Sequence, residues 1–342
     1  MLRIIALVAA LILSSSVFAA EVPLRASLQD GAQGKMLIAS RNAVGPREFV
    51  VPGSRAEQPA QVWGDLLLPV SGQPYPAIIL SHGSGGLDIY RDSYYDWAHR
   101  FTRMGIAVLV LDHFTPRGLK ETAHNQAAVS EWSMAADILN AAKLLATHPK
   151  IDKTKIATIG FSKGASAILM ANMAMMQKAF GLEAPLALHL AFYPSCNTMF
   201  KGLPPTAAPV IMFLGEIDDY TPASECRLAA SRINEQGGKA EAVVFRRAHH
   251  GFAVKGANVV FARTLENRGR CKRDFDHSTG NMTVRDTGAV FRVNSDEDKA
   301  YLKKCVTRGA HVGGNSKVRD QAIVKVRDVV LDRLLGKQVS GQ

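Results

Sequence analysis

The sequence predicts an α/β fold in which a mostly parallel, doubly wound central sheet is flanked by helices. Short and nearly continuous apolar segments alternate along the chain with longer stretches that have helical periodicity. Strands that are apolar at every position are typical of a sheet covered on both faces. The chain has 342 residues, of which 47% are hydrophobic, and it shows no internal repeat, so one large domain is expected.

The expected elements follow in chain order. Residues 1–19 form a leader, residues 20–60 an extended N-terminal arm, and residues 61–342 the main domain. The apolar segments predict strands at 61–69, 76–82, 106–112, 156–160, 185–194, 208–215 and 240–245. Helical spacing predicts helices at 91–105, 121–148, 165–178, 223–236 and 316–335. Residues 253–315 break this alternation, and within them residues 282–293 are typical of a hairpin.

The first 19 residues have the pattern of a secretory signal peptide. Arg3 precedes an apolar run over residues 4–13, and Val17–Ala19 supplies small residues for cleavage. The alternative, a membrane anchor, requires a longer apolar run. We therefore expect an exported protein, periplasmic or secreted, without membrane attachment after cleavage.

The net charge of +11 is distributed along the chain and forms no long basic block. This argues against nucleic acid as a partner and favours a diffuse positive field toward small acidic molecules. The oligomeric state is left open.

Four cysteines, an even number, favour disulfides in an exported chain. Of the three possible pairings we prefer the one that neither nests nor crosses, Cys196–Cys226 with Cys271–Cys305; buried free thiols are the alternative. There is no C-x-x-C spacing and no close His/Cys cluster in the sequence, so a zinc site is not expected. The chemistry expected below implies neither a metal nor an organic cofactor.

Residues 160–164 read Gly-Phe-Ser-Lys-Gly and lie between a predicted strand and a predicted helix. This G-x-S-x-G pattern is typical of a nucleophile elbow, a tight turn that presents a serine hydroxyl above a sheet. The glycines leave room for the strand and the helix to approach each other. A serine that only caps the helix is the alternative reading.

An acid and a histidine follow in the order that serine catalysis requires. Asp218 and Asp219 come after the predicted strand 208–215, and His249 and His250 come after the strand 240–245. One member of each pair is expected to act with Ser162.

Two backbone N–H groups are expected to form an oxyanion hole, one from Lys163 and one from Ser84. Ser84 lies in the glycine-rich loop 82–86 that follows an early strand. A plain glycine turn is the alternative reading of that loop.

These blocks together resemble the dienelactone hydrolase family, which has the α/β-hydrolase fold. The similarity spans residues 61–335 and is carried by "HGSGG" at 82–86, "DHFTPRG" at 112–118, "GFSKGA" at 160–165, "GEIDDYTP" at 215–222 and "HHGF" at 249–252. The resemblance implies that Asp218 is the triad acid, with Asp219 as runner-up, and that His250 is the triad histidine. It also supports the Cys196–Cys226 pairing. The founding enzymes of the family use cysteine as nucleophile, whereas this chain has Ser162, so the lactone substrate is not carried over.

The expected function is hydrolysis of a small-molecule carboxylic ester or lactone by an exported serine hydrolase, through an acyl-enzyme. Lys163, Arg117 and His249 are candidates to attract an anionic group on the substrate; a lysine side chain that extends into solvent is the alternative for Lys163. A peptidase or polyester hydrolase on the same triad is a rival interpretation. A non-catalytic ligand-binding scaffold is a rival of another class.

Overall fold

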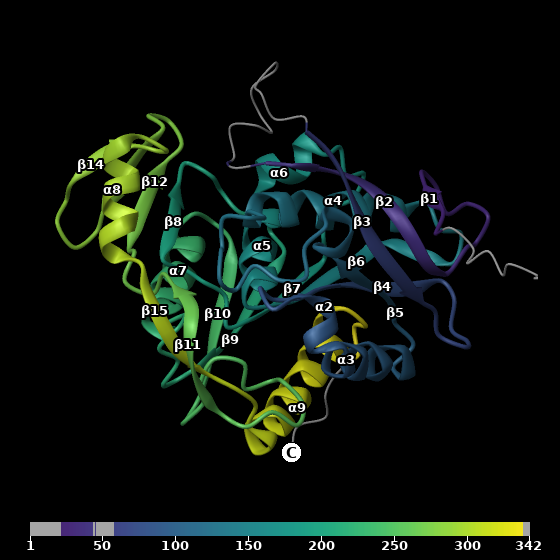
Figure 1. Cartoon of the computed structure of the whole chain (residues 1–342). Helices are drawn as coiled ribbons and strands as arrows, with labels where there is room; N and C mark the ends of the chain where they lie inside the picture. Colours follow the sequence, from purple (N-terminus) through teal and green to yellow (C-terminus); the bar gives the residue numbers. More distant parts are fainter. Residues whose placement is uncertain (1–21, 44, 46–57, 338–342) are drawn as a thin grey trace, which may run out of the picture.

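A nine-stranded sheet forms the centre of the protein (Figure 1). The computed structural model describes residues 22–43, 45 and 58–337. The strands of the sheet lie in the order β1-β2-β3-β5-β4-β6-β7-β9-β10. They are β1 (Leu24–Arg25), β2 (Gly34–Asn42), β3 (Gln58–Leu67), β4 (Tyr75–Ser81), β5 (Ala107–Asp112), β6 (Ile151–Phe161), β7 (Leu188–Phe192), β9 (Pro209–Gly215) and β10 (Lys239–Phe245).

Strands β5, β4, β6, β7, β9 and β10 run parallel to one another, whereas β3 is antiparallel to both β2 and β5. The carboxyl ends of the parallel strands therefore meet at one edge of the sheet, which is where binding sites form in open α/β sheets. The predicted mostly parallel sheet is confirmed.

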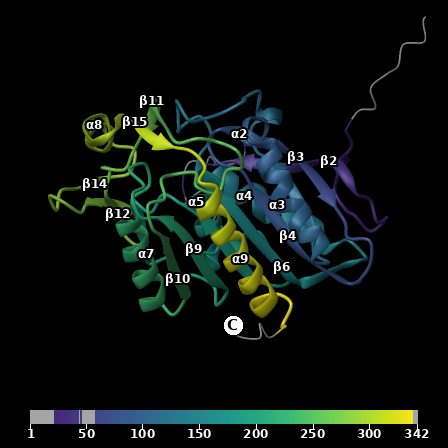
Figure 2. The same ribbon diagram turned by 90° about the horizontal axis from the view of Figure 1, so that it is seen from below.

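Helices cover both faces of the sheet because alternate strand residues are buried on opposite sides. On one face, Ile78 and Leu80 of β4 pack in a cluster with Trp97 of α3 (Arg91–Arg103) and Val326 of α9 (Ser316–Arg333). Figure 2, the view from below, shows α3 and α9 next to each other in front of the sheet. On the other face, α4 (Glu131–Ala146) and α5 (Lys163–Ala171) pack on β2, β4 and β6, and α7 (Ala223–Glu235) packs on β9 and β10. Short helices α2 (Gly86–Ile89), η1 (Thr115–Arg117) and α6 (Ala174–Ala179) complete this part.

Residues 253–315 form two small sheets and one helix. Strand β11 (Val260–Asn267) pairs antiparallel with β15 (Thr307–Val312). Strands β12 (Arg273–Asp276), β13 (Asn281–Val284) and β14 (Val290–Arg292) join β8 (Thr198–Lys201) in a second sheet, and α8 (Asp296–Cys305) follows. The β13–β14 pair confirms the predicted hairpin.

Both predicted disulfides are present, Cys196–Cys226 and Cys271–Cys305. The first joins the segment after β7 to α7, and the second closes the unit that contains β12, β13, β14 and α8.

The structure differs from the expected elements in three places. The arm expected at 20–60 contributes β2, which pairs with β3 over nine residues, so the boundary at 61 does not separate an arm from the domain. The helix expected at 121–148 begins at Glu131 because the Ser130 hydroxyl accepts from the N–H of Ser133 and caps it there. The helix expected at 165–178 is divided into α5 and α6.

The expected signal peptide lies outside the described residues. Over the part of the chain that the structure describes, no helix is both long and apolar enough to cross a bilayer.

Candidate active site

Ser162 lies on the turn between β6 and α5 and has the strained backbone expected of a nucleophile elbow. Its φ is +52° and its ψ is −118°, a conformation that residues with a side chain rarely adopt. A Cβ on Gly160 would lie 2.6 Å from the Gly164 oxygen, and one on Gly164 would lie 2.4 Å from the His82 oxygen. Both glycines of the motif are therefore required by the close approach of strand, helix and neighbouring loop.

Ser162, His250 and Asp218 form a continuous hydrogen-bonded chain. Nε2 of His250 lies 2.9 Å from the Ser162 hydroxyl, and Nδ1 of His250 lies 2.9 Å from Oδ2 of Asp218. Asp218 follows β9 and His250 follows β10, so both loops leave the same edge of the sheet as Ser162. Asp218 and His250 are each 5% exposed. One residue of each adjacent pair, Asp218 of 218–219 and His250 of 249–250, therefore takes part in the hydrogen-bonded series with Ser162.

The Asp218 carboxylate is held in place by its own loop. Its Oδ1 accepts hydrogen bonds from the backbone N–H groups of Tyr220 and Thr221, at 2.9 and 2.8 Å. The Thr221 hydroxyl lies 2.9 Å from Oδ2 of Asp218 and 3.0 Å from Nδ1 of His250. The rings of Tyr193 and Tyr220 lie 4.7 and 4.8 Å from the His250 ring. The imidazole is thus fixed by contacts on several sides, and Thr221 is a partner that the sequence interpretation missed.

The glycine-rich loop after β4 lies directly against the elbow. A Cβ on Gly83 would be 3.2 Å from Cβ of Ser162, and the N–H of Gly83 donates to the Tyr94 hydroxyl at 3.1 Å. Ser84 lines the same cavity as Ser162. Lys163 is the first residue of α5, where a backbone N–H has no acceptor within the helix. Both residues expected to supply an oxyanion amide are therefore neighbours of Ser162, Lys163 along the chain and Ser84 in the wall of the same cavity.

Two cavities of different character meet at Ser162 and Tyr220. The larger, of about 260 Å³, is mostly apolar. It is lined by residues 83–85 of the glycine-rich loop, by Phe161, by β11 and by the loop after β10. The smaller, of about 50 Å³, contains two acids and two bases: Glu131, Glu266, Lys163 and Arg268. Several wall residues come from 253–315, a segment whose role the sequence did not indicate.

The dienelactone hydrolase family model matches residues 64–273, more than half of the chain. The chain belongs to the dienelactone hydrolase family. This match includes Ser162, Asp218 and His250, and it ends before β13, α8 and β15.

Curated proteins with names that refer to ester or thioester hydrolysis are similar to part of this chain. The chain is 33% identical over 138 residues to human acyl-coenzyme A thioesterase 6, which covers 40% of this chain and 29% of the relative. It is 29% identical over 126 residues to esterase FrsA of Escherichia coli, which covers 35% of this chain and 26% of the relative. The chain thus spans less than a third of the length of these curated relatives.

Among solved structures, a thermophilic esterase of Thermogutta terrifontis with bound butyrate matches part of this chain. It matches with a TM-score of 0.46 and 18% identity, over 57% of this chain and 82% of that one. The phosphorylated form of the same esterase, obtained with paraoxon, matches with a TM-score of 0.46 and 19% identity, over 57% and 81% of the two chains.

The Arg117 side chain of this dienelactone hydrolase family member does not reach the cavities at Ser162. Its guanidinium forms two hydrogen bonds to Asp137, at 2.8 and 2.9 Å, and others to Asn42 and the His113 carbonyl. Because the Asp137 carboxylate is fully buried, it requires this partner. The expected substrate contact of Arg117 is therefore replaced by a structural ion pair.

The same network contains a second hydrogen-bonded Ser-His-Asp series, formed by Ser81, His113 and Asp137. His113 lies 2.8 Å from the Ser81 hydroxyl and 2.7 Å from Asp137. All three side chains are fully buried, and burial lowers the pKa of His113 to about 4. Solvent access therefore distinguishes the two series: Ser162 lines cavities, whereas the buried Ser81 is out of reach of a substrate.

The Lys163 side chain neither extends into solvent nor points freely into a cavity. It is 4% exposed, and its ammonium donates to the Gln126 carbonyl at 2.6 Å and to Thr122 at 3.2 Å. Burial is the largest cause that lowers the pKa of Lys163 to about 8; Glu131 opposes this shift and Arg268 adds to it. The Lys163 side chain is therefore neither extended into solvent nor free to bind an anion on the substrate. Its ammonium instead anchors the loop 122–126.

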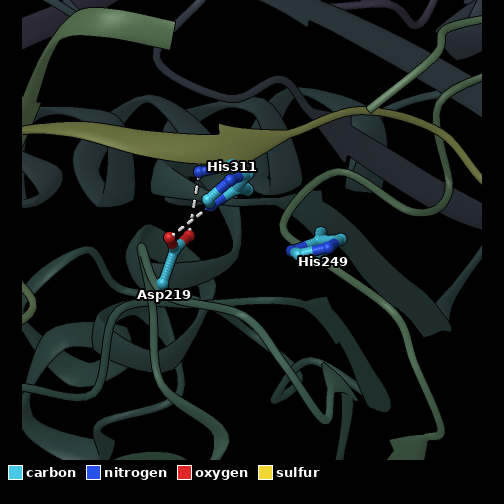
Figure 3. A group of neighbouring side chains, drawn as sticks. All are labelled: Asp219, His249 and His311. Atoms are coloured by element: carbon cyan, nitrogen blue, oxygen red, sulfur yellow. Dashed lines mark hydrogen bonds and ion pairs between the residues drawn. The ribbon is translucent and has the colours of Figure 1, made fainter. Parts of the chain in front are cut away.

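His249 lies away from the two cavities and faces Asp219 and His311 (Figure 3). Nitrogen and oxygen atoms of these three side chains lie within 4.8 Å of one another. No metal site was expected from the sequence because His311 is distant along the chain and only the β11–β15 pair brings it close.

Proposed function

We propose that this protein is a serine hydrolase that cleaves a carboxylic ester through an acyl-enzyme intermediate. The observation that carries the proposal is the Ser162–His250–Asp218 hydrogen-bonded chain, with both contacts of His250 at 2.9 Å, located where two cavities meet. Membership of a hydrolase family and partial similarity to an esterase support the same reaction class.

In the proposed mechanism, the Ser162 oxygen attacks the ester carbonyl while Nε2 of His250 takes its proton. The negative charge that develops on the carbonyl oxygen is stabilised by the backbone N–H groups of Ser84 and Lys163. His250 then donates its proton to the leaving alcohol. A water molecule, activated by His250, releases the acid and restores Ser162. Asp218 accepts a hydrogen bond from Nδ1 of His250 and so holds the imidazole in the tautomer that leaves Nε2 free to take the proton.

The two cavities suggest which ester is accepted. The cavity of about 260 Å³ suits an apolar group of the substrate, and the smaller cavity suits a compact polar group. An anionic group would meet Arg268 there rather than Lys163, and Glu131 and Glu266 balance the two bases. We therefore propose a substrate with one apolar and one polar side, and a preference for an anion only if Arg268 releases Glu266, which it contacts at 2.6 Å.

We also propose that the protein is exported. The signal-peptide pattern of residues 1–19 and the two disulfides support this. Sequencing the N-terminus of the protein recovered outside the cytoplasm would test it; a chain that retains Met1 would contradict it.

The decisive experiment compares Ser162→Ala with Ser81→Ala. Ser162→Ala should fold normally, lose ester turnover and no longer react with a fluorophosphonate probe. Ser81→Ala removes the serine of the buried Ser81–His113–Asp137 series and should retain both ester turnover and reaction with the probe. Ester turnover by Ser162→Ala at the wild-type rate would refute the proposal. A wild-type protein that neither reacts with the probe nor hydrolyses esters would favour the non-catalytic scaffold, and one that cleaves only peptides or polyesters would favour the rival substrates.

A further inference from the structure

Three segments that are far apart in the sequence meet beside the proposed triad. Asp219 follows Asp218 in the loop after β9, His249 precedes His250 in the loop after β10, and His311 lies on β15. Figure 3 shows the His249 ring on one side, directed toward Asp219 and His311 on the other. A potential ligand atom of each side chain lies within 4.8 Å of the other two.

Asp219 and His311 are already fixed relative to each other. The backbone N–H of His311 donates to Oδ1 of Asp219 at 2.9 Å, and Nδ1 of His311 lies 2.7 Å from Oδ2. The Phe261 ring lies 5.0 Å from the His311 ring and restricts it from the β11 side. Hydrogen bonds that a histidine donates to a carboxylate, together with packing of this kind, are what orient histidine ligands in metal sites.

His249 brings a polar atom that has no partner. Its ring lies 5.2 Å from that of His311, and its Nδ1 is buried and without a hydrogen-bond partner among the described residues. Buried polar atoms of side chains are nearly always satisfied, so such a nitrogen requires an explanation. A cation between the three side chains would supply one, because neutral imidazole nitrogens and a carboxylate are all electron-pair donors.

We propose that Asp219, His249 and His311 bind one divalent transition-metal ion, for which Zn²⁺ is the probe. Imidazole and carboxylate ligands together suit Zn²⁺ and similar ions, and a water molecule would complete a tetrahedral site. Ligand atoms about 2.0–2.1 Å from a tetrahedral ion lie about 3.3 Å from one another, so separations that lie within 4.8 Å must shorten by at most about 1.5 Å. The side chains of Asp219 and His311 are each 45% exposed, so the hydrogen-bonded pair can shift as a unit toward His249.

The ion would hold the two loops of the proposed triad to β15. His250 already forms an isolated bridge with Val312, and its carbonyl accepts from the N–H of Gly313 at 2.9 Å. The metal would add side-chain bonds to this backbone contact. His311 lies beyond residues 64–273, so the site would be an addition of this chain to the part shared with its family. The inference does not depend on the proposed ester hydrolysis.

The test is calorimetric titration of the metal-stripped, tag-free full chain with Zn²⁺, for the wild type and for His249→Ala, His311→Ala and Asp219→Asn. The matched control is His99→Ala, which removes an exposed histidine of α3. We expect one Zn²⁺ per chain in the wild type and the control, and affinity weaker by at least about tenfold in each site variant, since loss of a supporting residue alone costs about 10–100-fold.

Thermal unfolding gives a second readout. Zn²⁺ should raise the Tm of the wild type and of His99→Ala but not of His311→Ala, because an ion that binds only the folded chain stabilises it. Circular dichroism would reveal a histidine variant that does not fold. Asp219→Asn keeps the shape of its side chain, so it tests the site even in that case. Unchanged Zn²⁺ affinity in the site variants, or a wild type that binds no Zn²⁺ and shows no Tm shift, would overturn the proposal.

Discussion

Ser162 and Ser81 have similar partners and different surroundings. Each hydroxyl lies within 2.9 Å of a histidine nitrogen, and each histidine contacts an aspartate. Ser162 opens on two cavities, whereas Ser81 is fully buried beneath the elbow, where its side chain would contact any Cβ placed on Gly164. Hydrogen-bond geometry alone therefore does not identify a nucleophile; access for a substrate is also needed.

At the scale of single residues, Lys163 gives a prediction about pH. Its pKa is about 8 in the folded protein, below the ordinary value of 10.5, because of burial. Between these values the unfolded chain binds more protons than the folded one, so the contribution of Lys163 to the free energy of unfolding rises with pH. From pH 7.5 to 9.5 the rise is about 2 kcal/mol.

Urea unfolding of the wild type and of Lys163→Met at the two pH values would measure this contribution as a difference between the proteins. The wild type should gain stability relative to Lys163→Met as the pH rises. A constant difference would show that the Lys163 ammonium is not desolvated. With all four cysteines in disulfides, no thiol titrates in the same range.

At the scale of elements, the elbow depends on the absence of a side chain at Gly164. A Cβ there would lie 2.4 Å from the His82 oxygen and 2.5 Å from the Ser81 oxygen, both of which are backbone atoms that cannot rotate away. We expect Gly164→Ala to lower the free energy of unfolding by about 1–3 kcal/mol, as for other overpacked positions. The displaced elbow should also reduce kcat/KM for any ester that the wild type hydrolyses.

The matched control is Gly45→Ala, since a Cβ at Gly45 would have no described atom within 4 Å. Denaturant midpoints and ester kinetics of the two variants should therefore diverge. Equal stability and equal activity of both would mean that β6 and α5 approach each other less closely than described.

The predictable elements were those whose local sequence carries the full signal. The G-x-S-x-G turn, the apolar strands and the Asn315 cap of α9, whose side chain accepts from the N–H of Val318, could be inferred from a few adjacent residues.

The start of α4 was placed too early because residues 121–130 have helical composition. Their backbone is instead used by distant partners: the N–H of Thr122 donates to the Ser84 carbonyl, and the Gln126 carbonyl accepts from Lys163. Such long-range bonds override local propensity and leave no periodic signal.

At the scale of the whole molecule, the order serine, acid, histidine was readable because each residue follows its own strand and all these strands end at one edge of the sheet. The walls of the cavities were not readable. Ala257, Leu265 and Val312 line the apolar cavity only because β11 pairs with β15 and the His250 loop bridges to Val312. For the same reason, the group of Asp219, His249 and His311 could not be predicted, and Arg117 was assigned to the substrate although its partner is Asp137.

The apolar cavity gives a prediction about substrate length. If the acyl group of the ester occupies it, each added CH₂ buries apolar area worth about 0.8 kcal/mol, so kcat/KM should rise up to about fourfold per CH₂ until the volume of about 260 Å³ is filled. Ala257→Trp places a large ring in the cavity wall and should remove this rise, while acetate esters remain substrates. Initial rates over a series of esters with one leaving group and increasing acyl length measure the slope. Val324→Trp, on an exposed position of α9, is the control and should keep the wild-type slope. Identical slopes in the two tryptophan variants would show that the acyl group binds elsewhere and that the apolar cavity receives the alcohol side of the ester or no part of it.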